Sequence, residues 1–428
     1  MRLLRTWIKK TPFYKPLSLL LSKSKIYATR RSHQKKLIEL KKKETIKVLF
    51  IVIFDSVWKY EEFYRLLDES GRFEPLIVIA PHTNLVEEDM IKQVEHIYEK
   101  FKNKGYRVES SYDPSKGWLD YKSIYKPDIV CFTTPYNYTI SCYQFTWFYD
   151  VLTIYVPYAF VVIHKLELHY KMFFYNVLWK YFVESGIHKS YAKQFALLNT
   201  RHVIVSGYPG LDLLLQKQRL DNEIWKNPRN GRIRRVIWAP HHTIAGEGAG
   251  LDYSTFLSYY EVFIDLVEHY KGDLQIAFKP HPLLKAKLYK NKEWGKTRAD
   301  EYYNFWRNHP NGQLEEGDYI DLFHTSDALI HDSASFMAEY MVTKKPILFL
   351  VADKNLPSRF NSFGKELFQR HYRSETTEEV SRFIEGVVFE KNDSMYNIRA
   401  EFVEKHLTPP NKQTAAKNML DHIQKQLR

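Results

Sequence analysis

The chain has 428 residues, too many for one ordinary hydrophobic core, and this length fits two α/β domains with terminal extensions. Its composition, 44% hydrophobic and 26% charged, excludes a disordered or fibrous protein. The two cysteines, Cys131 and Cys142, are too few for a disulfide framework or a cysteine-rich zinc cluster, and they favour a reducing compartment.

The net charge of +13 is concentrated near the N-terminus. Residues 1–47 contain 15 Lys and Arg but only two acids, Glu39 and Glu44, so this segment alone accounts for the whole excess. Nucleic-acid-binding domains usually carry their positive face on the fold itself, so a basic arm on a balanced body predicts no nucleic-acid partner.

This basic arm has an interfacial pattern. Residues 1–10 place leucines, Trp7 and Ile8 at helical spacing opposite basic residues, and a second apolar patch follows at residues 17–21. Lys and Arg near an anionic leaflet contribute roughly 1 kcal/mol each. We therefore predict that residues 1–47 bind an anionic membrane surface. The alternative is a helix that covers the adjacent domain.

No apolar run reaches the ~20 residues that a spanning helix needs, since the longest, at residues 151–163, is interrupted by Pro157. A signal peptide is not predicted either. The predicted location is the cytoplasmic face of the cell membrane, with peripheral attachment.

The first half alternates apolar strands with amphipathic helices. Strands are predicted at residues 48–54, 75–81, 128–133 and 151–155, and helices at residues 58–70 and 85–104. This order is typical of a parallel sheet. A dinucleotide cofactor is not predicted, because no Gly-x-Gly-x-x-Gly turn follows the first strand.

The second half repeats this order after a polar, turn-rich stretch. Its predicted strands are residues 236–239, 274–278, 328–330 and 346–351, and its predicted helices are residues 254–270, 336–342, 376–389 and 412–427. The fold class is therefore α/β, with two Rossmann-like domains, 48–219 and 233–428, joined by a linker at 220–232. They are expected to face each other across a cleft, as in GT-B enzymes.

Four segments at predicted strand ends carry most of the chemistry. They read GYPGLD at 207–212, APHH at 239–242, KPHP at 279–282 and DLFHTSDALIHDSAS at 321–335, followed by Phe336, Glu339 and KPILF at 345–349. In their order and spacing they resemble the motifs of the CDP-glycerol glycerophosphotransferases, which build teichoic-acid-type and capsular polymers. The resemblance runs from about residue 181 to residue 351.

His281 is the strongest single candidate in these segments. It follows a strand between Pro280 and Pro282, which hold the backbone rigid, and Lys279 lies beside it. The resemblance implies that this histidine contacts the nucleotide diphosphate. We predict His281 as catalytic and Lys279 as substrate-binding.

His241 and His242 follow another strand, beside a glycine-rich loop. We predict phosphate contact by His241 and proton transfer by His242. Adjacent histidines do not easily ligate one metal, and no carboxylate cluster accompanies them, so neither a metal nor any other cofactor is predicted.

Asp332, Ser333 and Ser335 open the helix predicted at 336–342, where free amides and the helix dipole favour a pyrophosphate. Ordinary N-capping uses the same residue types and is the alternative. Glu339, one turn later, is predicted to accept a hydrogen bond from a ribose or polyol hydroxyl, or else to be a solvated helix residue. His324 is a further binding candidate. It flanks a strand together with His331, and at least one of the two should be packed in the core.

The first domain departs from the family. Its teichoic-acid members carry a Trp-His-Gly motif whose histidine is thought to deprotonate the acceptor, whereas this chain reads IYVPY at 154–158. The nearest bases are His164, His169 and Asp55, of which His164 is our catalytic candidate. Asp55 and Gly207 are counted as substrate-binding.

The resemblance implies that an acceptor hydroxyl of a cell-surface polymer or its lipid-linked precursor attacks the β-phosphorus of CDP-glycerol or CDP-ribitol and releases CMP. A nucleotide-sugar glycosyltransferase of the same fold is the first alternative. A non-catalytic polymer-binding subunit is the second.

Overall fold

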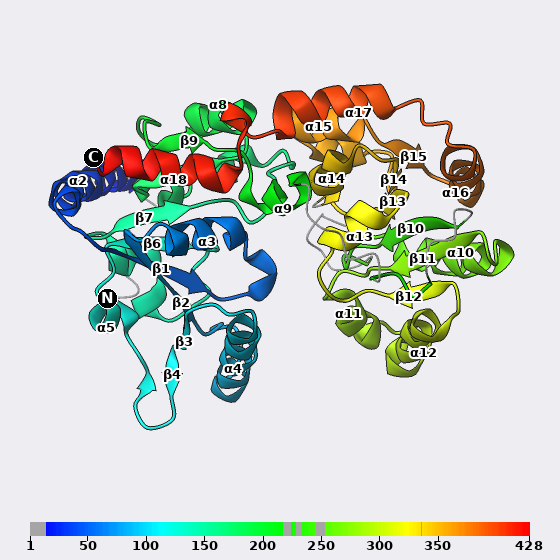
Figure 1. Ribbon diagram of the computed structural model, residues 1–428, viewed down its shortest axis with the longest axis horizontal. Coiled ribbons are helices and arrows are strands. Elements are labelled where there is room, and N and C mark those ends of the chain that lie inside the picture. Colours follow the sequence, from blue (N-terminus) through cyan, green and yellow to red (C-terminus); the bar gives the residue numbers. More distant parts are fainter. Residues whose placement is uncertain (1–13, 217–223, 228–232, 245–252, 335) are drawn as a thin grey trace. The chain divides into compact units, whose positions relative to one another are not determined.

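The computed structural model describes residues 14–216, 224–227, 233–244, 253–334 and 336–428. It divides the chain into two compact units (Figure 1). Unit 1 comprises residues 1–161, 165–212 and 409–428, and unit 2 comprises residues 162–164 and 213–408.

Unit 1 is built on a seven-stranded parallel sheet of order β3-β2-β1-β6-β7-β8-β9. From β3 to β9 the strands are Val108–Ser110, Phe73–Ile79, Ile46–Val52, Ile129–Phe132, Leu152–Tyr155, Lys180–Val183 and Val203–Val205. The chain moves outward from β1 through β2 to β3 and then returns to the other side of β1 with β6. This reversal is the switch point at which doubly wound sheets bind ligands.

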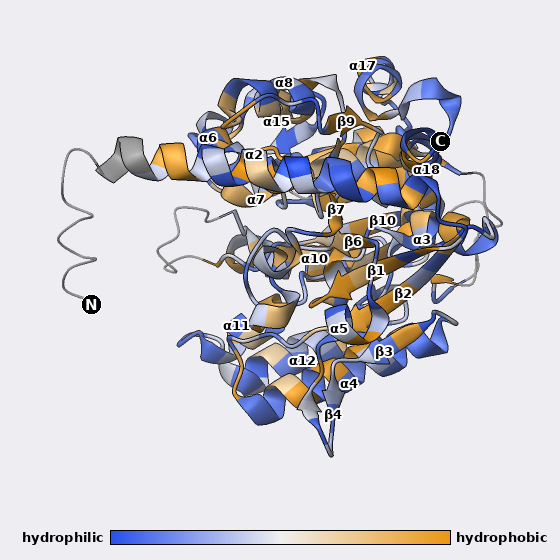
Figure 2. Cartoon of the chain, turned by 90° about the vertical axis from the view of Figure 1, so that its left-hand side faces the viewer, coloured by the Kyte–Doolittle hydropathy of each residue, from blue (hydrophilic) through white to orange (hydrophobic). Residues whose placement is uncertain are grey.

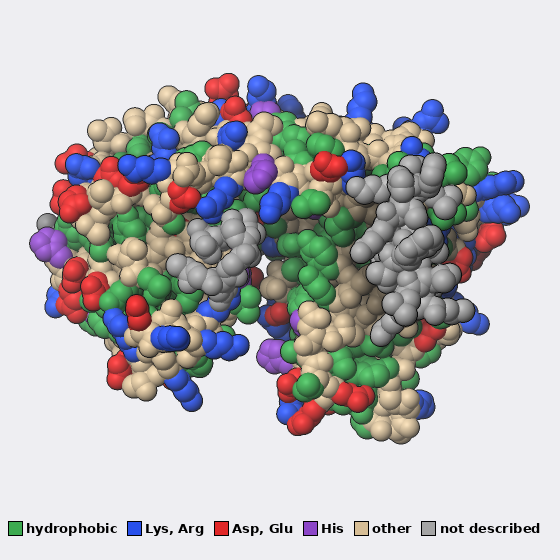
Figure 3. Space-filling view, turned by 180° about the vertical axis from the view of Figure 1, so that it is seen from behind, with side chains coloured by type: hydrophobic (Ala, Val, Ile, Leu, Met, Phe, Trp, Pro, Cys, Tyr) green, Lys and Arg blue, Asp and Glu red, His purple; other side chains and the backbone are tan. Residues whose placement is uncertain are grey.

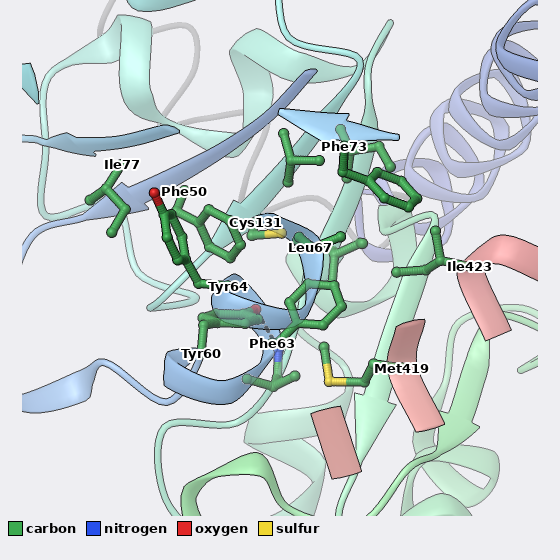
Figure 4. Packing of buried hydrophobic residues seen from close by; sticks show 14 of the residues in the cluster. Phe50, Tyr60, Phe63, Tyr64, Leu67, Phe73, Ile77, Cys131, Met419 and Ile423 are labelled. Atoms are coloured by element: carbon green, nitrogen blue, oxygen red, sulfur yellow. Dashed lines mark hydrogen bonds between the residues drawn. The ribbon is translucent and has the colours of Figure 1, made fainter. Parts of the chain in front are cut away.

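The core of unit 1 joins segments from both ends of the chain. Phe63 and Leu67 of α3 (Glu61–Glu69) belong to the same buried cluster as Met419 and Ile423 of α18 (Ala415–Gln426), and Figure 4 shows these side chains together. α4 (Glu87–Asn103) adds Val94, Ile97 and Phe101 to this cluster.

Unit 2 repeats the strand order in a six-stranded parallel sheet, β12-β11-β10-β13-β14-β15. These strands are Gly312–Leu314, Leu274–Phe278, Arg234–Ala239, Ala328–His331, Ile347–Leu350 and Tyr372–Ser374. Its switch point lies between β10 and β13. The main helices are α10 (Phe256–His269), α11 (Leu284–Lys290), α12 (Gly295–Asn308), α15 (Ser362–Phe368) and α17 (Tyr396–Phe402). The predicted fold class, two Rossmann-like parallel sheets, is confirmed.

The predicted domain limits need two corrections. The first unit gives way to the second after Asp212, and the C-terminal segment 409–428 belongs to unit 1. The carboxylate of buried Asp212 accepts from the amides of Ala415 and Ala416, both at 2.8 Å, so it satisfies the free donors at the start of α18.

The predicted linker 220–232 lies largely outside the described residues. Its described part, residues 224–227, belongs to unit 2, where the indole of buried Trp225 donates to Thr325 Oγ1 at 2.8 Å.

The predicted arm at 1–47 is also corrected in part. Residues 1–13 lie outside the described residues, but α2 (Tyr14–Lys41) is a single helix that packs on unit 1, and β1 already begins at Ile46. Ile26, Leu37 and Leu40 are buried. α2 is therefore a helix that covers the adjacent domain, as in the alternative given in the sequence analysis.

Several cations of α2 have partners in unit 1. Arg30 donates to the carbonyl of Asn176 at 2.9 Å, and Lys36 lies 3.4 Å from the carboxylate of buried Asp128. The arm's charge is therefore not all available to a membrane. Towards the N-terminal end of α2, Leu19, Leu20 and Leu21 are exposed, in the apolar stretch visible in Figure 2.

Outside this helix, charge is mixed. On the face drawn in Figure 3, Lys and Arg side chains alternate with Asp and Glu and do not gather into one patch. In the part of the chain that the structure describes, no helix is both long and apolar enough to cross a bilayer.

Candidate active site in unit 2

Three histidines meet at the carboxyl edge of the second sheet. His241 and His242 follow β10, and His281 follows the adjacent β11. The ring centroids lie 4.3 Å apart for His241 and His242, 4.2 Å for His242 and His281, and 5.1 Å for His241 and His281. Parallel pairing of β10 and β11 places the two loops at one edge, so the sheet itself assembles the cluster.

Asp332 fixes the loop that carries His241. Fully buried after β13, its carboxylate accepts from the His241 amide at 2.5 Å, and from the Thr255 amide and hydroxyl at 2.6 and 2.9 Å. Burial raises the pKa of Asp332 to about 6, while these bonds act in the opposite direction. One side chain thus ties the ends of β10 and β13 to the start of α10.

The rings of His241 and His281 are uncharged near neutral pH. Burial, followed by the neighbouring His242, lowers the pKa of both His241 and His281 to about 3. A neutral imidazole carries a single N–H, so the position of that proton decides what the ring can bind.

Backbone amides assign that proton. The Leu283 amide donates to Nδ1 of His281 at 3.1 Å, and the Thr243 amide donates to Nδ1 of His241 at 3.3 Å. The Thr243 hydroxyl, 2.9 Å from the same Nδ1 of His241, can donate to it as well. A nitrogen that accepts such bonds carries no hydrogen, so this arrangement places the proton of both rings on Nε2. His241 and His281 therefore offer N–H donors, which suit a phosphate oxygen.

The same cluster has the spacing of a metal site. The ligand atoms of His241, His242 and His281 all lie within 4.8 Å of one another. The sequence analysis predicted no set of histidines close enough to share a metal ion, and that prediction is wrong. Coordination through Nε2 would move the proton to Nδ1 and break the bonds from Leu283 and Thr243. The proton positions favour an anion over a metal ion.

The predicted helix N-terminal anion site is not formed as expected. α14 (Phe336–Glu339) has only four residues and continues as a 3-10 turn (Tyr340–Thr343), so it lacks the dipole of a full helix. Asp332 is occupied with His241 and Thr255, and Ser333 is buried. Ser335 lies outside the described residues.

Lys279 and Glu339 are both buried. The Lys279 ammonium donates to the Gly317 carbonyl at 2.6 Å, and burial lowers its pKa. Glu339 is 3% exposed and accepts from the Tyr319 hydroxyl at 2.6 Å, so the solvated-residue alternative is wrong. The described contacts give both residues structural partners.

Two further candidates of unit 2 lie outside the cluster. His324, in α13 (Ile320–Thr325), is half-buried, and its carbonyl accepts from Lys345 at 2.5 Å. His164 is exposed, and its Nδ1 lies 2.8 Å from the Arg359 carbonyl. His331 is fully buried against Phe349 and His371, which confirms that one of the two flanking histidines is packed in the core.

The candidates of unit 1 have local explanations. Gly207 has φ +87°, and a Cβ there would meet the Pro409 side chain at 2.6 Å, so the turn needs glycine. Asp55 pairs with Lys100 on α4. The His169 ring lies 4.4 Å from that of Tyr175, tilted by 35°, and burial lowers the pKa of His169 to about 4.

A family model described as CDP-Glycerol:Poly(glycerophosphate) glycerophosphotransferase matches residues 174–424. The teichoic acid ribitol-phosphate polymerases TarL and TarK of Staphylococcus aureus are 24% and 25% identical over 197 residues. That alignment covers 40% of this chain and 31% and 34% of theirs, so the chain spans about a third of the curated relatives that it matches.

Two solved structures share the fold. The wall teichoic acid polymerase TagF has a TM-score of 0.59 at 12% identity, over 97% of both chains. The MnaA–UDP structure of S. aureus has a TM-score of 0.55 at 14% identity, over 90% of this chain and 97% of that one. These likenesses extend through both units.

Proposed function

Since the chain belongs to the CDP-Glycerol:Poly(glycerophosphate) glycerophosphotransferase family, we propose that it transfers glycerol phosphate or ribitol phosphate from a CDP-activated donor to a hydroxyl of a cell-surface polymer or its lipid-linked precursor. The observation that carries this proposal is the pair of neutral N–H donors on His241 and His281, at the carboxyl ends of β10 and β11.

The reaction forms one P–O bond and breaks another. The acceptor hydroxyl attacks the β-phosphorus of the CDP-polyol and loses its proton to a base, and CMP leaves with the bridging oxygen. Negative charge grows on that oxygen during the step. Preorganised N–H donors stabilise such charge without reorganising, which is the role we assign to the Nε2 groups of His241 and His281.

The His242 ring adjoins both of these rings, with its centroid 4.2 Å from that of His281 and 4.3 Å from that of His241. We assign it proton transfer to the departing CMP. Asp332 acts through His241, as a positioning residue.

The donor is tested by thermal melting of the full chain with CDP-glycerol, CDP-ribitol, CMP and UDP-N-acetylglucosamine. A donor at 100 times its Kd adds about 2.7 kcal/mol to the free energy of unfolding. The melting temperature should rise with at least one CDP-polyol and remain unchanged with the UDP-sugar. A rise with the UDP-sugar alone would favour the glycosyltransferase alternative, and no rise with any nucleotide would favour a non-catalytic subunit.

We also propose that transfer needs no metal, because Nε2 of His241 and His281 carries the proton that a metal would have to displace. Activity should persist after treatment with EDTA and a zinc-selective chelator, and the purified chain should contain much less than one equivalent of zinc. The control is the same preparation incubated with one equivalent of Zn²⁺, which should not increase turnover. Loss of activity on chelation that only Zn²⁺ restores would refute the assignment.

The third part of the proposal is peripheral attachment through the N-terminal segment. Residues 1–25 contain seven Lys and Arg and no acid, and Leu19, Leu20 and Leu21 are exposed at the N-terminal part of α2. Deleting residues 1–47 would also remove the buried face of α2 and the start of β1. A deletion of residues 1–13 combined with Leu19, Leu20 and Leu21→Ser leaves that face intact.

We expect the full chain to sediment with anionic vesicles at low salt, and the altered chain to remain in solution with an unchanged melting temperature. Neutral phosphatidylcholine vesicles provide the control, since the cations contribute little there. Equal sedimentation of the two chains, insensitive to salt, would contradict attachment through this segment.

A further inference from the structure

Helix α2 is attached to unit 1 through Arg30. The helix packs against α7 (Phe173–Val177) and β7 (Figure 2). The half-buried Arg30 guanidinium donates to the carbonyls of Asn176 and Asn199, at 2.9 and 3.0 Å, and to Nδ1 of His202 at 3.0 Å. Its acceptors among the described residues are all neutral. The guanidinium is therefore held by hydrogen bonds to neutral groups and not by an ion pair with one of these acceptors.

The contact between Arg30 and His202 fixes the position of the imidazole proton. A guanidinium only donates, so Nδ1 of His202 must accept. Nε2 of the same ring lies 2.8 Å from the Tyr175 carbonyl, which only accepts, so Nε2 must donate. The neutral ring therefore fits with its single proton on Nε2. A second proton would lie on Nδ1, facing Arg30, and would replace a hydrogen bond with the repulsion of two cations.

His33 brings a second neutral imidazole to the same contact, about one turn further along α2. Its side chain is 2% exposed. Burial, followed by Arg30 among the nearby charges, lowers the pKa of His33 to about 4 and that of His202 to about 3. An unfolded histidine has a pKa of about 6.5, so both rings bind protons more readily once they are released from this contact.

The other groups that face His202 do not offset a second charge. Lys180, at the start of β8, and His33 act on His202 in the same direction as Arg30. The two elements on which α2 packs, α7 and β7, contain no acid. Their titratable groups are Tyr175 and Tyr155, which stay uncharged because burial raises their pKa values well above 10.

Two acids lie close to α2, and both have cationic partners. Asp150 acts to raise the pKa of His33, but its carboxylate is exposed and pairs with Lys122 at 2.6 Å. Buried Asp128 pairs with Lys36 and Lys43. Protonation of the two histidines would therefore add positive charge to a contact that is already cationic.

We propose that Arg30, His33 and His202 form a proton-sensitive latch, which holds the N-terminal part of α2 on unit 1 at neutral pH and releases it in acid. Leu37 and Leu40 belong to the main core cluster of unit 1, so the C-terminal end of the helix stays attached. Release is a local opening and not the unfolding of the unit. The inference does not depend on the proposed transfer, because none of these residues takes part in it.

Hydrogen–deuterium exchange of the full chain at pH 7.5 and pH 5, corrected for the intrinsic exchange rates, measures this opening. The stability that each neutral ring contributes is complete above pH 6.5 and is lost as the pH falls towards the folded pKa, about 4 for His33 and about 3 for His202. At pH 5 each ring should raise the opening constant of α2 about 30-fold, and both together roughly a thousandfold. Peptides from β1 and β2, in the core of the same unit, should change much less.

Two variants and a control assign the effect to these rings. In His202→Gln the carboxamide can accept from Arg30 and donate to the Tyr175 carbonyl, but it binds no proton between pH 5 and pH 7.5. The acid-induced rise should therefore shrink about 30-fold, and His33→Leu should shrink it by a similar factor. His96→Gln, at an exposed position on α4 of the same unit, should leave the rise unchanged.

The latch is overturned if α2 opens no more at pH 5 than at pH 7.5, or if the rise persists in full in both His202→Gln and His33→Leu. A reduction of the same size in His96→Gln would also overturn it. Equal opening of α2, β1 and β2 at pH 5 would do so as well, because the unit would then unfold as a whole.

Discussion

Replacing His281 with alanine is expected to lower both the turnover and the affinity for CDP ten- to a hundredfold. The Nε2–H of His281 is a preorganised donor, and a hydrogen bond to a charged oxygen is worth roughly 1.5–3 kcal/mol. At about 1.4 kcal/mol per tenfold change, this loss corresponds to one to two powers of ten. Steady-state CMP release and isothermal titration with CDP measure the two effects separately.

The control for this substitution is His269→Ala, an exposed histidine in the last turn of α10. It should leave both quantities unchanged. His281→Gln keeps an N–H donor and should recover part of the affinity. If His281→Ala instead lowers the melting temperature of the free chain and leaves CDP binding intact, His281 is a structural residue and the diphosphate site lies elsewhere.

Replacing Asp332 with alanine is expected to have the largest effect on stability. The substitution leaves three buried donors without their acceptor: the amides of His241 and Thr255, and the Thr255 hydroxyl. Each unsatisfied buried group costs about 1–3 kcal/mol, so the free energy of unfolding should fall by about 3 kcal/mol or more. Urea denaturation measures this change, and the affinity for CDP should fall with it because the His241 loop loses its anchor.

Asp265→Ala provides the matched control, since Asp265 is an exposed acid on α10 of the same unit. It should change stability by less than about 0.5 kcal/mol. A stable Asp332→Ala chain that has lost only its CDP affinity would show that Asp332 contacts the donor directly. A chain unchanged in both respects would remove Asp332 from the account.

The repetition of strands and helices was predictable because it depends on local patterns. The runs at residues 48–54 and 274–278 are continuous apolar segments of strand length, and they correspond to β1 and β11. Short edge strands such as β12 (Gly312–Leu314) and β15 (Tyr372–Ser374) carry no such run. They form because the backbone of a neighbouring strand, β11 for β12 and β14 for β15, pairs with them through hydrogen bonds.

The packing of α2 was harder to predict. Its buried residues Ile26, Leu37 and Leu40 are widely spaced among cations. The many cations therefore indicated a membrane-binding segment, and the few apolar residues did not indicate a helix packed on the domain. The return of the C-terminal segment to unit 1 depends on Asp212, whose partners lie about 200 residues later, at Ala415 and Ala416. Neither contact has a local signature.

The sequence predicts the individual histidines of the candidate site but not how they are arranged in space. His281, His241 and His242 were identified at strand ends, yet the meeting of the three rings depends on β10 and β11 being neighbours. Asp332 was assigned to a helix N-terminus, whereas it anchors the His241 loop and Thr255. Thr255 was not identified at all. The signal available for it was its position before an apolar helix, where threonine is a common cap.

The most direct test of the central claim is ³¹P NMR of the full chain incubated with CDP-glycerol or CDP-ribitol and an acceptor that carries a free polyol end. The account predicts that the diphosphate resonances of one donor decline while CMP and a new phosphodiester resonance grow in equal amounts, and that His281→Ala slows this exchange ten- to a hundredfold. Growth of a phosphate monoester in place of the phosphodiester, or an unchanged diphosphate with both donors, would contradict it.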